Sequence, residues 1–190
     1  MARGEGKILM VAYPYKGREL PEFALSVRQP WAWAIIHAGK DIENRSAPAV
    51  RNMGHCRIPV AVHAAKGMTQ QEYVDAYDFM RSIGVVCPPA GALLRGGVIG
   101  MVQIVDVVSF SKSRWFFGPR GLVLRGAEAC EFVPAVGALG LFMWKPADAS
   151  IVPPPAKWMR PKTDVEHPIS RKVTSDLFEQ MTSRRSEDER

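Results

Sequence analysis

The stretch 25-LSVRQPWAWAIIHAGKDIENR-45 predicts a strand, a short helix and a second strand in direct succession. Leu25 to Val27 has the character of the first strand, and Pro30 stands where a helix tolerates a first residue that lacks an N–H group. Gly39 supplies the left-handed residue that commonly ends a helix. Lys40 to Arg45 then follows as a strand. The stretch therefore places a tryptophan-rich helix directly before a dense run of charge.

The predicted helix carries two tryptophans with different expected roles. Trp31 and Ile35 share one face at helical spacing, which predicts that both face the core. Trp33 lies about 200° around the helix from Ile35, at roughly 100° per residue. It therefore leaves on nearly the opposite side, where it either packs beneath the N-terminal extension or forms a base-stacking wall of a cleft.

The charged strand should alternate its side chains between two faces. Alternation predicts that Lys40, Ile42 and Asn44 point one way. The other face would then carry Asp41, Glu43 and Arg45.

The rest of the chain predicts an α+β fold in which strands outnumber helices. Thr69 and Glu72 form a capping box that opens a helix ending near Gly84. The near-continuous apolar run from Gly97 to Ser109 predicts a long strand buried on both faces. Residues 110–121 have the character of an ordered loop. Further strands are expected at Ile8 to Tyr13, Arg57 to His63, Leu122 to Arg125 and Gly140 to Trp144.

Composition divides the 190 residues into one domain and two extensions. We expect an N-terminal extension over residues 1–23, a domain over residues 24–145, and a Pro-rich, charged C-terminal extension over residues 146–190. In the last of these, Leu177, Phe178 and Met181 have the spacing of a short amphipathic helix that could dock on the domain or on a protein partner.

The net charge of +6 is concentrated in the predicted domain. Residues 24–145 carry 13 Lys and Arg against 8 Asp and Glu, whereas residues 146–190 carry 8 of each kind. A basic excess in the middle of the chain favours a globular module that faces polyanions over a basic tail.

Several classes of protein are not indicated by the sequence. The apolar run from Ile8 to Tyr13 is too short for a signal peptide or a membrane span, so we expect a cytoplasmic protein without a membrane partner. The three cysteines form no C-x-x-C pair, which predicts small buried thiols. The histidines show no ligand spacing, and no P-loop, Rossmann or G-x-S-x-G motif is present. We expect neither a metal nor a cofactor.

The opening stretch, 25-LSVRQPWAWAIIHAGKDIENR-45, resembles the start of the ASCH domain (activating signal cointegrator homology), a branch of the PUA-like superfamily. Further segments match in the same order: 57-RIPVAVHAAK-66, 96-GGVIGMVQIVDVV-108, and 115-WFFGPRGLVL-124 with 137-GALGLF-142. The resemblance covers residues 24–145. It implies a small, partly open PUA-like β-barrel with flanking helices and a cleft.

The resemblance also implies a class of ligand. PUA-like domains bind RNA or read modified bases, some ASCH proteins are ribonucleases, and small bacterial relatives hydrolyse the acyl amide of N4-acetylcytidine. Because one fold serves both binding and catalysis, membership of the family does not choose between them.

Lys40, Glu43 and Arg45 fall at the family's G-x-K-x-x-[ET]-x-R motif, here 38-AGKDIENR-45, with Ala38 at the position of the first glycine. In the amidohydrolase branch the lysine is catalytic and works with a threonine and a glutamate. Glu43 occupies the threonine position, so it could act as a general base, orient a water or neutralise Lys40. A structural pair of Glu43 and Arg45 on one face of the strand is the equal alternative.

His63 and Lys66 lie at the end of the second strand, and the resemblance implies that both side chains point toward the cleft. Lys66 near Lys40 would form a phosphate or carboxylate subsite, with an exposed loop lysine as the alternative. His63 could exchange a proton near neutral pH. From the sequence we favour a hydrogen-bonded structural histidine.

Two further sets of residues are expected near the cleft. Arg28 and Gln29 directly precede the helix. They could form an anion site with the first turn of the helix, or Gln29 could cap the helix. Trp115 lies in a segment where aromatic residues alternate with basic ones, which suits single-stranded nucleic acid. Its alternative is an inward-facing anchor. The segment is 110-FSKSRWFFGPRG-121, with Arg114 directly before Trp115.

The sequence thus predicts an ASCH-type module that binds RNA, another single-stranded nucleic acid or a modified nucleoside in a basic cleft. The residues expected to bind are Arg28, Gln29, Trp33, Lys40, Arg45, Lys66, Arg114 and Trp115. The alternative is an enzyme with the same cleft, either a metal-independent ribonuclease or an amide hydrolase on an acylated cytidine. Its catalytic residues would be Lys40, Glu43 and His63.

Overall fold

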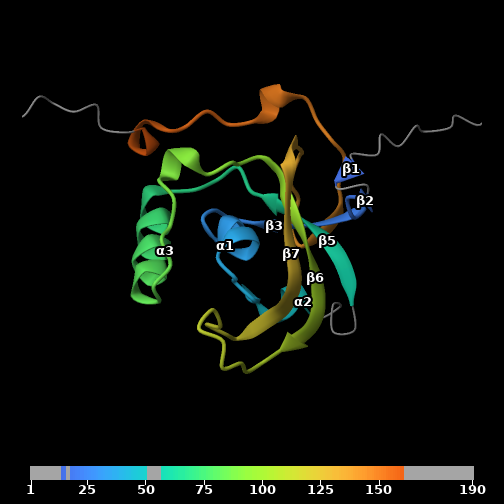
Figure 1. Cartoon of the computed structure of the whole chain (residues 1–190), viewed down its shortest axis with the longest axis vertical. Coiled ribbons are helices and arrows are strands. Elements are labelled where there is room, and N and C mark those ends of the chain that lie inside the picture. The colour runs from blue at the N-terminus through green and yellow to red at the C-terminus, as the bar shows by residue number, and fades with distance from the viewer. Residues whose placement is uncertain (1–13, 16–17, 51–56, 161–190) are drawn as a thin grey trace, which may run out of the picture. The chain divides into compact units, whose positions relative to one another are not determined.

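The computed structural model describes residues 14–15, 18–50 and 57–160 (Figure 1). Its elements in chain order are β1 (Pro14–Tyr15), β2 (Arg18–Glu19), β3 (Phe23–Val27), α1 (Trp31–His37), β4 (Ile42–Arg45), α2 (Ala47–Val50), β5 (Ile58–Ala64), α3 (Gln70–Ser82), η1 (Ala90–Ala92), β6 (Gly97–Val108), β7 (Arg120–Pro134), β8 (Leu141–Met143), η2 (Ala149–Ile151) and η3 (Lys157–Met159). The strand predicted at Ile8 to Tyr13, Cys56 and the helix predicted around Phe178 lie outside the described residues.

Six strands form one sheet in the order β4–β7–β6–β5–β3–β8, curled into half a barrel (Figure 1). Strands β3 and β5 are parallel, and the other neighbours are antiparallel. With few helices beside this sheet, the α+β prediction is confirmed. Strands β4 and β3 are not neighbours in the sheet, yet Arg45 Nη2 of β4 donates a hydrogen bond to Ser26 O of β3 at 2.7 Å. We call this meeting place of β4 and β3 the seam.

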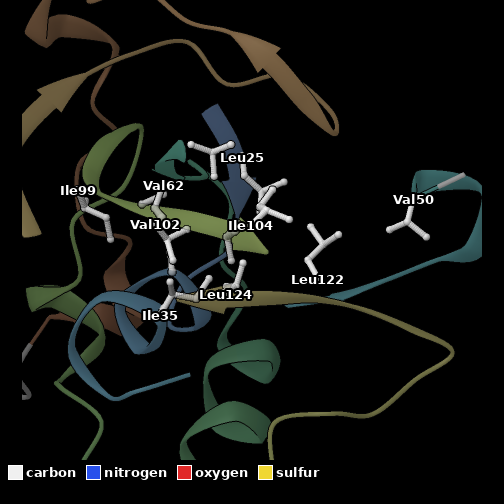
Figure 2. Packing of buried hydrophobic residues seen from close by; sticks show 13 residues of the cluster. Leu25, Ile35, Val50, Val62, Ile99, Val102, Ile104, Leu122 and Leu124 are labelled. Atoms are coloured by element: carbon white, nitrogen blue, oxygen red, sulfur yellow. The ribbon is translucent and has the colours of Figure 1, made fainter. Parts of the chain in front are cut away.

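The concave side of the sheet encloses the main hydrophobic core, against which helix α1 packs. Figure 2 shows side chains from β3, α1, β5, β6 and β7 gathered there, among them Leu25, Ile35, Val62, Ile104 and Leu124. Ile35 is fully buried and Trp31 is partly buried against the same cluster, as the helical spacing predicts. Burial of these apolar side chains holds α1 inside the curl.

Two of the three local signals for the two longer helices are confirmed. Gly39 has a φ of +66° and directly follows the C-cap residue of α1. Thr69 and Glu72 form the reciprocal capping box at the start of α3. Pro30 is the N-cap of α1, so it lies one place before the helical position that we predicted for it.

Two strand predictions need correction. Strand β7 runs from Arg120 to Pro134 and is far longer than the predicted Leu122 to Arg125. Gly126, with a φ of +62°, resembles a strand end in the sequence, but the ladder with β6 continues past it through register shifts. In β6 only residues 97–100 are buried without interruption, while Gln103 and Asp106 are exposed, so burial on both faces holds for its first part alone.

Residues 146–159, which composition assigns to the C-terminal extension, pack on the domain. Met159 is buried. The Met159 carbonyl oxygen packs so closely on Gly91 that a Cβ atom at position 91 would lie only 2.6 Å from it. The guanidinium of Arg95 donates to Lys66 O at 2.8 Å and to Pro154 O at 3.1 Å, which ties this segment to the end of β5. No helix within the described residues is long and apolar enough to cross a bilayer.

Candidate functional site

Three charged residues converge at the seam. Lys40 Nζ lies 2.8 Å from Glu43 Oε2, and Arg45 Nη2 lies 3.3 Å from Glu43 Oε1. Lys40 Nζ also donates to Ile42 O. The side chains of Lys40 and Glu43 are only 2% and 11% exposed. We call these three residues the seam cluster; it holds one carboxylate between two cations with little contact to water.

The alternation predicted for Lys40 to Arg45 is only partly correct. Glu43 and Arg45 do share one face of β4 and form the predicted ion pair. Lys40, predicted on the opposite face, instead contacts Glu43. The reason is that β4 begins at Ile42, so Lys40 belongs to the turn after Gly39 and does not follow the alternation of a strand.

The seam carries an excess of positive charge. Arg45 lies directly opposite Arg120 of β7 in the antiparallel register, and Arg120 is exposed. Like charges facing each other across two strands are unfavourable. Glu43 compensates only part of this charge, and within the described residues the buried Nε of Arg45 has no hydrogen-bond partner. An anion at this place would relieve the repulsion.

His63 joins the seam through Ser26 but lies in the interior. Its Nδ1 is 3.1 Å from Ser26 Oγ and its Nε2 is 3.0 Å from Ala135 O. Burial lowers the pKa of His63 below 6.5. The hydrogen bond to Ala135 O opposes this shift, and the charge of Lys66 makes a smaller contribution that lowers the pKa further. Both ring nitrogens are engaged, which is the structural alternative considered for this residue.

Three predicted binding residues make their contacts away from the seam cluster: Arg28, Gln29 and Lys66. Arg28 forms an ion pair with Glu72, and Lys66 is exposed at the end of β5. Gln29 is buried: its Nε2 donates to Leu94 O at 2.7 Å and its Oε1 accepts from Trp33 N at 2.9 Å. Gln29 thus caps α1, and the amide of Trp33 is already occupied.

The tryptophans predicted to stack on bases serve as packing residues. Trp115 is 6% exposed, and its ring centroid lies 5.6 Å from that of Phe79 and 6.4 Å from that of Trp31. It is therefore the inward-facing anchor. Trp33 is half-buried against a cluster formed by Met68, Ala90, Leu93 and Met159. Arg114 is exposed in the loop before β7.

Sequence reasoning did not single out Phe117, which the structure presents to solvent. The residue is 56% exposed, although its ring lies 4.8 Å from that of Phe79. Asn44 holds the backbone on both sides: its Nδ2 donates to Trp115 O, and its Oδ1 accepts from Phe117 N, both at 2.8 Å. The three consecutive aromatic residues 115–117 give no local signal that separates the anchor from the exposed ring.

Neither a family model nor a curated protein matches this chain. The part of the chain that the structure describes contains no group of three His, Cys, Asp or Glu side chains that could hold a metal ion. The sequence predicts small buried thiols: of the two described cysteines, Cys87 is buried and Cys130 is half-buried, and burial raises the pKa of each to about 11.

Proposed function

We propose that the domain binds single-stranded RNA or a modified nucleoside at the seam, as an ASCH-type, PUA-like module. The observation that carries the proposal is the pair of arginines, Arg45 and Arg120, directly opposite each other at an edge of the sheet. Two arginines at opposite positions of neighbouring strands repel each other, and a phosphate bound between them would turn this repulsion into a stabilising contact.

The neighbouring carboxylate of Glu43 could bind the base of the same nucleotide. Glu43 is fixed on both oxygens by Lys40 and Arg45, and the Lys40 ammonium lies 6.0 Å from the centroid of the Trp31 ring. A carboxylate can accept a hydrogen bond from the exocyclic amine of cytosine, and guanidinium groups bind base or phosphate oxygens. The seam therefore offers a partner for the phosphate and a partner for the base of a nucleotide.

Arg120→Ala tests the proposal with little risk to the fold, because Arg120 is exposed. We expect weaker binding of a single-stranded RNA, together with a salt slope reduced by about 1, since one phosphate contact is lost. Arg125→Ala is the matched control, as Arg125 is an exposed arginine of the same strand that faces Gln103. If the wild-type protein binds no RNA at low salt, or if both variants weaken binding equally, the proposal is wrong.

Catalysis at the seam is the second candidate function, and the contact between Lys40 Nζ and Glu43 Oε2 favours it. A lysine held beside a carboxylate in a nearly dry place can stabilise developing negative charge while the carboxylate moves a proton. Incubating the protein with RNA and with N4-acetylcytidine, with and without EDTA, tests this. Turnover that survives EDTA and disappears in Glu43→Gln would support an enzyme; binding without turnover would leave the module.

A further inference from the structure

We infer that the loop of residues 109–119, between β6 and β7, is a stacking platform for a base of a single-stranded nucleic acid whose phosphates lie at the seam. The inference rests on the proposed function and narrows its ligand from a free nucleoside to a strand of several nucleotides. Phe117 is the residue that would stack.

The middle of the loop, residues 113–117, is held by contacts with β4, α3 and the segment before β4. Trp115 anchors it in a hydrophobic cluster with Met80 and Ile42. Asn44 binds the backbone at Trp115 and Phe117, and Ser113 Oγ donates to Asp41 Oδ1 while accepting from Trp115 N at 3.1 Å. A stacking surface fixed in advance loses little conformational entropy when a ligand binds.

Phe117 packs against other aromatic rings on one side and is open to solvent on the other. Its ring lies 4.8 Å from that of Phe79 and 6.3 Å from that of Trp31, both in edge-to-face arrangements, while 56% of the residue is exposed. A large apolar ring that remains this exposed on a well-anchored loop is available for a planar partner. Bases stack on such rings regardless of sequence, because every base has a π-face.

The charges around Phe117 favour a nucleic acid over an apolar protein surface. The loop 109-SFSKSRWFFGP-119 contains Lys112 and Arg114, both exposed, and no Asp or Glu. Phe110, at its start, is also exposed. Aromatic side chains interleaved with cations suit bases linked by phosphates, whereas a protein partner would need acidic groups set among apolar ones.

The platform and the seam are close enough to serve one strand. Arg120 follows Phe117 by three residues and opens β7 opposite Arg45. Trp31 lies next to both places, since its ring neighbours Phe117 and the ammonium of Lys40. A nucleotide held at the seam by its base and phosphate would therefore place the base of a linked neighbour toward Phe117, so the two places together require at least two linked nucleotides.

The test compares a labelled RNA of about eight nucleotides, within the usual site sizes, with a single nucleotide, using fluorescence anisotropy and competition at low salt. We expect Phe117→Ala to weaken binding of the RNA by about 5- to 150-fold, the effect of losing one stacked base. Binding of the single nucleotide at the seam should change little. DNA of the same sequence shows whether the 2′-hydroxyl contributes.

Two further variants keep the result interpretable. Phe117→Leu retains apolar packing on Phe79 but lacks a π-face, so it should lose most of the same affinity. Leu139→Ala changes a residue that is 99% exposed in the turn before β8, and should bind RNA as the wild type does. A thermal melt of each variant confirms that the fold is retained.

The outcomes separate this inference from the proposed function. If the wild type binds RNA through Arg120 but Phe117→Ala and Phe117→Leu bind equally well, the platform is wrong and the seam proposal stands. If Phe117→Leu alone binds like the wild type, the contact is apolar packing and the stacking inference is also wrong. If no nucleic acid binds at all, both fail together.

Discussion

The seam cluster and the 109–119 loop meet around strand β4, which is an edge strand of the sheet, and they differ in which side chains they expose. Glu43 and Arg45 leave one face and Asn44 leaves the other. At the seam, Lys40 and Glu43 are buried. On the loop side, Phe110 and Phe117 are exposed while Asn44 holds the backbone.

This difference shows that residue type alone does not decide exposure in this protein. A buried charge is tolerated where opposite charges and carbonyl groups surround it, as they do Lys40. An exposed aromatic ring is tolerated where a neighbouring ring, here Trp115, already anchors the segment. The seam therefore holds charged side chains that are buried, and the loop holds aromatic side chains that are exposed to solvent.

The largest expected effect is on the seam. Glu43→Gln leaves two cations without their carboxylate, so we expect the free energy of unfolding to fall by about 3–5 kcal/mol. The surface pair Arg81 and Asp78 has the same spacing along the chain but lies exposed on α3. Asp78→Asn should cost less than about 1 kcal/mol. Equal losses in urea denaturation would mean that the seam is as solvated as the helix surface.

Nearly as large an effect should appear inside the loop. Trp115→Ala removes a buried ring and is expected to cost about 3–5 kcal/mol. Phe117→Ala, two residues away, should cost about 1 kcal/mol or less, because more than half of that residue is already exposed. Thermal or chemical denaturation of both variants measures the contrast. Similar losses would show that Phe117 is a core residue and would weaken the platform.

A smaller effect is expected from pH on the interior beside the seam. Because burial lowers the pKa of His63 below 6.5, the unfolded chain takes up a proton before the folded protein does as the pH falls. Stability should therefore be complete above about pH 6.5 and decrease below it. Urea midpoints across this range should show a weaker pH dependence in His63→Gln. The exposed residue His37 serves as the control, and His37→Gln should retain the dependence.

The smallest effect is expected at Arg120, where strand β7 faces the seam. Arg120→Ala removes the like-charge neighbour of Arg45, so the protein should become more stable by about 0.2–1 kcal/mol while its affinity for RNA decreases. A denaturation curve at low salt is the measurement. A clear loss of stability would mean that Arg120 supports the fold, and the argument from repulsion would fail.

Features that act over a few residues could be predicted from the amino-acid sequence alone. The capping box of Thr69 and Glu72, the left-handed Gly39 and the buried Ile35 follow from spacing and from local backbone preference. The pairing of Glu43 with Arg45 follows from the two-residue period of a strand.

Which charged groups and aromatic rings reach solvent depends instead on contacts between distant parts of the chain. Asn44 contacts Trp115 across 71 residues of chain, and Ser26 contacts His63 across 37. No local pattern encodes such contacts, since they depend on how the sheet curls and on which strands meet at the seam. For this reason the sequence could gather the charged residues into one motif, but it could not distinguish the buried Trp115 from the exposed Phe117.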